Sequence, residues 1–360
     1  MLNDKTTKYK RWFRNFLLCS MGPLLLVALF NYRLDRFGLF HPNKELKTAA
    51  VNLLNGKMIA GLLDSYEERE FQRLIVENYS KRREVVLIGS SRNMLSRRSF
   101  IGRDVDFFNH SLGGPALEDH IAISGFYRVK GGMPKTILLG IDPWIFNKNN
   151  GLPQQWKSLS RYYEKIVAEI YGREINVNPF QPEKYMQLIN LEFTKKNYKY
   201  FRKGKKFKVT DTVDIDNFVR EPDGSIHFPY RMRFKKDERS NPYPPQARPI
   251  ATLNNFESLS GMELFEDFVI YLQKKEVEVI LLLLPFHPAA YRLCNENPEY
   301  QIVIALEKQL KDFALRNHIK LIGSYDPGKY QLKGKDFIDD THGHEIVAEK
   351  VFQEYHWTKP

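Results

Sequence analysis

Val85-Val86-Leu87-Ile88-Gly89-Ser90-Ser91-Arg92 is the stretch of this 360-residue chain that decides its fold. The run of four apolar residues from Val85 to Ile88 is typical of a strand buried on both faces within a parallel sheet. The Gly-Ser-Ser sequence that follows predicts a tight turn, so Ser91 is expected at the carboxyl end of a central strand. Enzymes with α/β folds often expose a nucleophile at this position.

A second segment, Asp339-Asp340-Thr341-His342, lies near the other end of the chain. It places a carboxylate three residues before a histidine, so one loop can supply a general base and the group that orients it. Taken singly, most Gly-Ser-Ser sequences are only turns, and most histidines near a carboxylate are surface pairs. Together the two segments predict a triad of Ser91, His342 and Asp339.

Strand-like and helix-like patterns alternate through much of the sequence. This alternation predicts an α/β fold with a doubly wound, parallel, five-stranded sheet in flavodoxin-like order. The predicted strands cover residues 84–88, 104–109, 135–141, 277–284 and 319–323.

The N-terminus predicts a membrane anchor. A basic tail at residues 1–15 precedes an uncharged, apolar stretch at 16–32. At about 1.5 Å per residue this stretch is roughly 25 Å long, which is just sufficient to cross a bilayer core. The positive charge predicts a cytoplasmic N-terminus, with the rest of the chain outside the cytoplasm. A cleaved signal peptide is the alternative, but no small-x-small cleavage site follows the stretch.

The remaining chain divides by composition. A helical stalk is predicted at residues 33–82. The two halves of the α/β domain are predicted at residues 83–141 and 256–360. Residues 142–255 are rich in Tyr, Pro, Asn and Lys and lack the strand–helix rhythm, so they are interpreted as an insertion after the third strand. Within it, Glu221-Pro222-Asp223-Gly224 predicts the turn of a hairpin.

Charge and cysteine content limit the possible partners. The net charge is +12, and Lys195 to Lys208 holds eight Lys or Arg residues interleaved with aromatic residues. Outside the cytoplasm this segment favours anionic lipid head groups or an acidic glycan over nucleic acid, although a solvated charged loop is the alternative. The only cysteines are Cys19 and Cys294, which form neither a disulfide framework nor a zinc motif. We therefore predict no metal and no cofactor.

The motifs resemble those of the SGNH (GDSL-like) hydrolase superfamily, in particular its membrane-anchored, extracytoplasmic branch. That branch includes the D-alanyl-transfer protein of teichoic acid modification and the O-acetyltransferases of alginate. The family's Gly-Asp-Ser block corresponds to Gly89-Ser90-Ser91, and its Asp-x-x-His block to Asp339 and His342. The block with an asparagine and a glycine corresponds to Asn109 through Gly114. The resemblance covers residues 84–141 and about 256–355.

The resemblance implies roles for individual residues. Ser91 would be the nucleophile, and the backbone N–H groups of Ser91 and Gly114 would form the oxyanion hole. Asp340 is a rival to Asp339 as the orienting carboxylate, because alginate-type enzymes use an Asp-x-His spacing that Asp340 and His342 also satisfy. Asn109 is a further possible site residue.

One block departs from the family pattern. Gly140-Ile141-Asp142-Pro143 has an acid where the family has an oxyanion-binding asparagine. Because an ionised carboxylate repels an oxyanion, Asp142 must be protonated, turned away or used otherwise. An equally good interpretation is that the Asp142 side chain caps the turn that begins at the Asp142-Pro143 step.

Two further residues have two interpretations each. His287 follows the fourth predicted strand and could either bind substrate or order its loop through a hydrogen bond. Arg92 could bind an anionic group of a ligand or form an ion pair with a carboxylate on a helix.

The resemblance implies a serine acyltransferase that O-acylates a cell-surface polysaccharide, with acetyl as the first expectation. Its implied partners are an acylated donor, the polysaccharide and a multi-pass membrane acyltransferase of the MBOAT type. Two alternatives remain open at this point. One is an extracytoplasmic carbohydrate esterase or deacetylase, and the other is a catalytically silent scaffold of a polysaccharide-modification complex.

Overall fold

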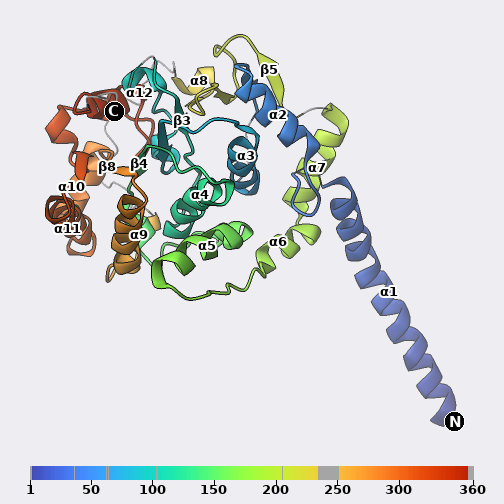
Figure 1. Cartoon of the computed structure of the whole chain (residues 1–360). Helices are drawn as coiled ribbons and strands as arrows, with labels where there is room; N and C mark the ends of the chain where they lie inside the picture. Colours follow the sequence, from blue (N-terminus) through green and yellow to red (C-terminus); the bar gives the residue numbers. More distant parts are fainter. Residues whose placement is uncertain are drawn as a thin grey trace. The chain divides into compact units, whose positions relative to one another are not determined.

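The computed structural model describes residues 2–355 except for residues 36, 62, 64, 103, 205 and 234–250. The chain divides into two compact units. The first unit contains residues 1–46 and 180–206, and the second contains 47–179 and 207–360. Figure 1 shows the chain coloured along the sequence. The predicted insertion at 142–255 falls partly outside the described residues, because it includes 234–250.

The second unit contains a parallel, five-stranded sheet, which confirms the predicted α/β class. Its strand order is β3-β2-β4-β8-β9, and every neighbouring pair is parallel. The order reverses at β2, because the chain passes from β2 to β3 on one side and then to β4 on the other. Ligands of open α/β sheets bind beside such a reversal, at the carboxyl ends of the strands. The strands are β2 (Val85–Ile88), β3 (Phe107–Asn109), β4 (Thr136–Gly140), β8 (Glu278–Leu283) and β9 (Lys320–Gly323).

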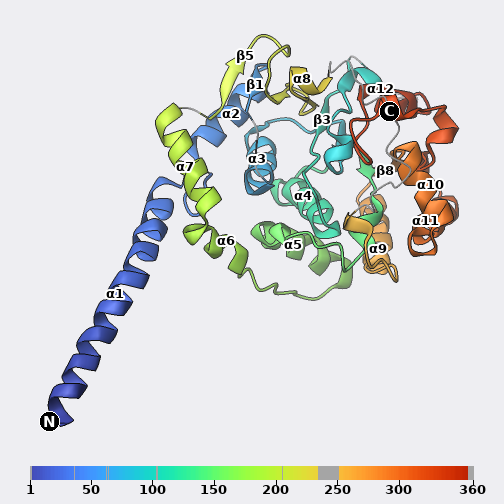
Figure 2. The same ribbon diagram turned by 180° about the vertical axis from the view of Figure 1, so that it is seen from behind.

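Helices cover both faces of this sheet. Alternate strand residues point to opposite faces, so Val86 packs with α4 (Leu117–Lys130) and α9 (Met262–Lys274) in one apolar cluster. Val85 packs with α12 (Glu345–Phe352) in a second cluster. The helices α5 (Ser160–Tyr171), α10 (Pro288–Glu296) and α11 (Ile302–Arg316) add to the first cluster. Figure 2 shows these helices from behind.

A second, antiparallel sheet brings together segments far apart in the sequence. Strand β1 (Met58–Ala60) lies between β5 (Lys208–Thr210) and β6 (Val219–Arg220). Strand β6 pairs with β7 (Ile226–His227), which confirms the predicted hairpin around Pro222-Asp223. Within the segment 33–82, which was predicted as a helical stalk, strand β1 lies between the two helices α2 (Lys44–Leu54) and α3 (Ser65–Asn78).

The first unit contains the N-terminal helix α1 (Leu2–Leu34). An 18-residue window within its segment Thr7–Leu34 has a mean hydropathy of 1.7, so α1 is long and apolar enough to cross a membrane. Near its end Asn31 is fully buried, and its amide donates hydrogen bonds to the carbonyl of Leu188 at 2.8 Å and the hydroxyl of Thr194 at 2.7 Å. The same unit holds the short helix α6 (Pro182–Met186), a 3-10 turn (Gln187–Ile189) and α7 (Leu191–Lys203).

Candidate active site

The turn after β2 is held by its own side chains. The hydroxyl of Ser90 accepts a hydrogen bond from the N–H of Arg92 at 3.1 Å, and Asn93 Oδ1 accepts from the N–H of Ser90 at 3.2 Å. A Cβ atom at Gly89 or at Gly140 would lie 2.4 Å from Asn93 Oδ1. Only glycine at these two positions lets Asn93 close the turn, which leaves Ser91 at the end of the strand.

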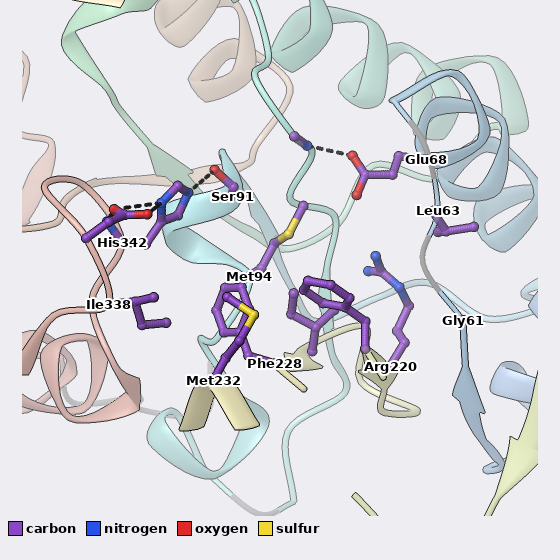
Figure 3. A pocket seen from close by; sticks show the side chains of 14 residues that line it. Gly61, Leu63, Glu68, Ser91, Met94, Arg220, Phe228, Met232, Ile338 and His342 are labelled. Atoms are coloured by element: carbon purple, nitrogen blue, oxygen red, sulfur yellow. Dashed lines mark hydrogen bonds and ion pairs between the residues drawn. The ribbon is translucent and has the colours of Figure 1, made fainter. Parts of the chain in front are cut away.

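The structure brings the two predicted segments together at Ser91. The Nε2 atom of His342 lies 2.8 Å from Ser91 Oγ, and its Nδ1 atom lies 2.9 and 3.0 Å from the two carboxylate oxygens of Asp339 (Figure 3). With the proton of the neutral imidazole on Nδ1, that nitrogen donates to Asp339 and Nε2 accepts from the serine hydroxyl. This is the arrangement in which a serine is activated by a neighbouring base.

Asp339, not Asp340, is the carboxylate placed against His342 Nδ1. Burial alone raises the pKa of Asp339, but hydrogen bonds from the imidazole and backbone of His342 and the backbone of Thr341 outweigh burial and lower its pKa well below the ordinary value. The pKa of Asp340 is raised, by burial and by the neighbouring charge of Asp339. The backbone carbonyl of Asp340 accepts a hydrogen bond from the N–H of His287 at 3.2 Å.

Arg92 and Asp142 form a buried ion pair. Arg92 Nη1 lies 2.6 Å from Asp142 Oδ1, and both side chains are almost fully buried. The same guanidinium donates from Nε to the carbonyl of Thr341 at 3.0 Å, and from Nη2 to the carbonyl of Pro285 at 2.7 Å. The partner of Arg92 is therefore a strand-end carboxylate and not a helix carboxylate. The Asp142 side chain makes no capping hydrogen bond to the turn that follows it.

Asn109 and His287 order loops in the structure. The amide of Asn109 donates to the carbonyls of Asn93 at 2.8 Å and Ser96 at 3.0 Å, which fixes the turn that carries Ser91. His287 Nδ1 accepts a hydrogen bond from the N–H of Ala289 at 3.1 Å at the start of α10. Neither side chain lines the cavity beside Ser91.

The predicted oxyanion donor, Gly114, is the neighbour of a glycine that lies at the cavity. Gly113 lines the cavity together with Ser91, whereas Gly114 is not among the lining residues. The N–H of Gly113 donates a hydrogen bond of 2.6 Å to Glu68 Oε2, so a carboxylate of α3 occupies this donor (Figure 3). A carboxylate is therefore already held one residue before the glycine whose N–H the resemblance implies as an oxyanion donor.

A cavity of about 310 Å³ opens beside Ser91 and His342. Glu68 and Arg220 are charged groups on its wall, and most of the other side chains are apolar. Arg220 is buried, and this burial lowers its pKa while the negative charge of Glu68 opposes the shift. The apolar wall includes Met94, Phe218, Ile226, Phe228 and Ile338.

Sequence reasoning missed this cavity wall. Glu68 belongs to the segment predicted as a stalk, and Phe218 and Phe228 flank the predicted hairpin inside the insertion. Nothing in the local pattern of these residues indicates that they meet Ser91. The one available signal is the hairpin itself, whose flanking aromatic residues need an apolar partner.

No family model and no curated protein matches this sequence. The function proposed below therefore depends on the geometry of the site.

Proposed function

We propose that the protein is a membrane-anchored, extracytoplasmic serine acyltransferase of the SGNH-like class that O-acylates a cell-surface polysaccharide. The observation that carries the proposal is the continuous contact from Asp339 through His342 to Ser91, with 2.8 Å between Nε2 and Oγ. Structural serines and histidines seldom meet at the rim of a cavity with a carboxylate behind the imidazole.

The proposed reaction has two halves. Ser91 Oγ attacks the ester carbonyl of the donor, His342 Nε2 takes the hydroxyl proton, and the same proton passes to the departing alkoxide as the acyl–serine ester forms. A sugar hydroxyl then gives its proton to Nε2 and attacks that ester. The new sugar ester leaves, and the proton returns to Ser91. Asp339 keeps the imidazole in the required tautomer throughout.

The negative charge that develops on the carbonyl oxygen needs donors. The N–H groups of Ser91 and Gly113 are proposed for this role, each contributing about 3–4 kcal/mol to the transition state. Gly113 replaces Gly114 here because Gly113 lines the cavity. Glu68 must then release the N–H of Gly113 when substrate binds.

One feature supports catalysis over a silent scaffold, and a second supports acyl transfer over hydrolysis. The ion pair with Arg92 neutralises Asp142, so its charge does not act against an oxyanion at Ser91. The membrane-spanning helix supports a transferase by analogy alone, because an acyl donor made inside the cell must be passed across the bilayer. An MBOAT-type membrane acyltransferase is the proposed partner for that step.

Labelling with a fluorophosphonate tests the nucleophile. The full-length protein in detergent is expected to be labelled, and Ser91→Ala should abolish the label with little change in melting temperature. Ser158→Ala, at an exposed serine in the same unit, is the matched control and should be labelled like the parent. Labelling of the Ser91→Ala protein would exclude Ser91 as the nucleophile.

A chromogenic ester and an oligosaccharide acceptor distinguish the alternatives. Acylated sugar detected by mass spectrometry supports the transferase. Release of free acid alone would make the protein an esterase, and no turnover together with no labelling would make it a scaffold.

A further inference from the structure

Most of the side chains that line the cavity beside Ser91 are apolar. Met94 comes from the turn after β2, and Ile338 comes from the loop that carries His342. Phe218, Ile226 and Phe228 come from the segment of the β6–β7 hairpin. Figure 3 shows Met94, Phe228 and Met232 grouped beside Ser91 and His342. The nucleophile therefore opens onto hydrophobic side chains.

The cavity volume sets the size of the group that it accepts. A volume of about 310 Å³ corresponds to about ten water molecules at roughly 30 Å³ each. An acetyl group would leave most of this wall in contact with water. Since burial of each additional methylene is favourable, a longer chain gains binding with every carbon until the cavity is full.

We propose that the acyl group carried by Ser91 is a medium-length aliphatic chain, with about six to ten carbons estimated from the water-equivalent volume. This inference rests on the proposed function and changes only the acyl group expected from the resemblance. The chain would extend from Ser91 past Met94 toward Phe228, with its carbonyl oxygen at the N–H of Gly113.

Chain-length profiles test the inference. The full-length protein in detergent is assayed with nitrophenyl esters of two, four, six, eight and ten carbons. The value of kcat/KM is expected to rise about threefold per added methylene before it falls. A decline from the acetate ester onward would overturn the inference while leaving the serine mechanism intact. No turnover of any ester and no fluorophosphonate labelling would instead refute the proposed function.

A cavity variant supplies the second readout. Phe228→Ala removes a ring from the wall and should move the preferred ester to a chain at least two carbons longer. Val129→Trp, at an exposed position of α4, is the control and should leave the profile unchanged. An unchanged optimum in a Phe228→Ala protein that is labelled normally would show that the chain does not lie on this wall.

A separate observation concerns the first unit, where α7 and the 3-10 turn (Gln187–Ile189) pack against α1 (Figures 1 and 2). Asn197 of α7 donates a hydrogen bond of 3.0 Å to Asn31 Oδ1, and the ring of Phe193 lies 5.4 Å from that of Phe37. These contacts hold α7 beside the C-terminal end of α1, where the predicted membrane span ends.

The outward side of these elements combines apolar and basic side chains. Tyr185, Met186 and Ile189 are each more than half exposed, beside the last turns of α1. On α7, exposed Leu191, Lys195, Tyr198 and Arg202 follow at helical spacings that place them on one stripe, opposite the buried residues Phe193 and Asn197. Such a stripe is unfavourable in water but matches a bilayer surface, where aromatic rings and cations lie at the head groups.

We infer that residues 182–202 form a membrane-contact surface that binds anionic phospholipid head groups, with Tyr185, Met186 and Ile189 at the acyl boundary. The continuity of this surface with α1 identifies the bilayer as its occupant. Lys195 pairs with Glu192 at 2.9 Å, but this pair is exposed and contributes little, so Lys195 can exchange it for a lipid phosphate. Together with Arg202 it favours anionic lipids. An acidic glycan, the other sequence-based expectation for this segment, would not require the exposed apolar residues.

Site-specific fluorescence tests this surface. Bimane is attached to Met186→Cys in the full-length protein with Cys19→Ser and Cys294→Ser, in liposomes of phosphatidylcholine and phosphatidylglycerol. Brominated lipid should quench the label, and aqueous iodide should not. A label at Leu315→Cys, an exposed position of α11, provides the reference for access by iodide. Iodide quenching of Met186→Cys equal to this reference would overturn the inference.

The charge preference has its own control. Brominated phosphatidylglycerol should quench the Met186→Cys label at least about twofold more than brominated phosphatidylcholine. Lys195→Gln with Arg202→Gln should abolish this difference. Lys308→Gln with Arg316→Gln removes the same two side-chain types from exposed positions of α11 and should leave the difference intact. Equal quenching by the two lipids in the parent protein would exclude selection of anionic lipid.

Discussion

Asp339 determines which nitrogen of His342 carries the proton. Its two oxygens accept from Nδ1, and its Oδ1 also accepts from the backbone N–H of His342 at 2.7 Å. The carboxylate therefore fixes both the imidazole ring and the loop that bears it. Asp340, the next residue, is not the carboxylate that contacts His342 Nδ1, and its pKa is raised and not lowered.

Asp339→Asn should lower kcat for an ester about 10³- to 10⁴-fold, because the amide favours the imidazole tautomer that cannot accept from Ser91. Asp340→Asn is the matched control and should change kcat by less than about threefold, within the scatter of ordinary surface changes. Comparable losses in both variants would show that the orienting role is shared.

The lowered pKa of Asp339 also predicts how its contribution to stability depends on pH. A carboxyl whose folded pKa is depressed stabilises the fold above its unfolded pKa of about 4 and loses that contribution as pH falls through the folded value. The difference in melting temperature between the parent protein and Asp339→Asn should therefore be largest near neutral pH and should narrow toward about pH 2. A melting-temperature difference that widens as the pH falls would contradict this expectation.

Glu68 occupies the N–H of Gly113 that the proposed mechanism assigns to the oxyanion. Glu68→Gln should raise kcat/KM severalfold, because a neutral amide holds the Gly113 N–H less strongly than a carboxylate and does not repel an oxyanion. The value of kcat/KM for an ester, measured with the full-length Glu68→Gln protein, tests this expectation. A tenfold fall in kcat/KM would instead assign Glu68 to substrate binding.

Only part of the site is visible in the sequence. Ser91, His342 and Asp339 were predictable because each belongs to a short motif whose chemistry needs those residue types at that spacing. Gly113 and Glu68 were not, because their contact joins a loop to a helix that precedes the whole domain. Local pattern carries no information about such a pairing.

At the level of elements, the Arg92 side chain joins the ends of β4 and β8 to the loop of His342. It contacts Asp142 after β4, Pro285 after β8 and the carbonyl of Thr341. The position of the loop that carries His342 therefore depends on one buried guanidinium.

Removal of one partner of this ion pair should be costly. Asp142→Asn should lower the free energy of unfolding by about 3–5 kcal/mol, because it leaves the Arg92 charge buried without its counterion. Arg92→Met with Asp142→Leu should recover most of that loss. Lys308→Gln, which breaks the exposed pair with Asp312, is the control and should cost less than about 1 kcal/mol. Denaturant unfolding in detergent measures all three.

The parallel strands were predictable because they are buried on both faces and so appear as continuous apolar runs, as in Val85–Ile88 and in Glu278–Leu283 after its first residue. The β6–β7 hairpin was predictable from its turn. Strand β1 was not, because three residues are too few to show alternation and both partners of β1 lie far away in the sequence.

At the scale of the whole molecule, the orientation of α1 decides where the reaction takes place. The five Lys and Arg residues before the apolar stretch predict a cytoplasmic N-terminus. Alkaline phosphatase fused after residue 360 should therefore be active in a bacterial host, and green fluorescent protein at the same position should be dark. The reverse pattern would place the site of Ser91 in the cytoplasm and exclude a surface polysaccharide as its substrate.

The place of β1 in the small sheet has a consequence for synthesis on the ribosome. Its neighbours β5 and β6 are made about 150 residues later, which takes roughly 7–30 s at ordinary elongation rates. Throughout that interval both edges of the nascent β1 lack their final neighbours, while the apolar helix before it has already been synthesised. A chaperone that shields this short stretch would therefore raise the yield of correctly assembled protein.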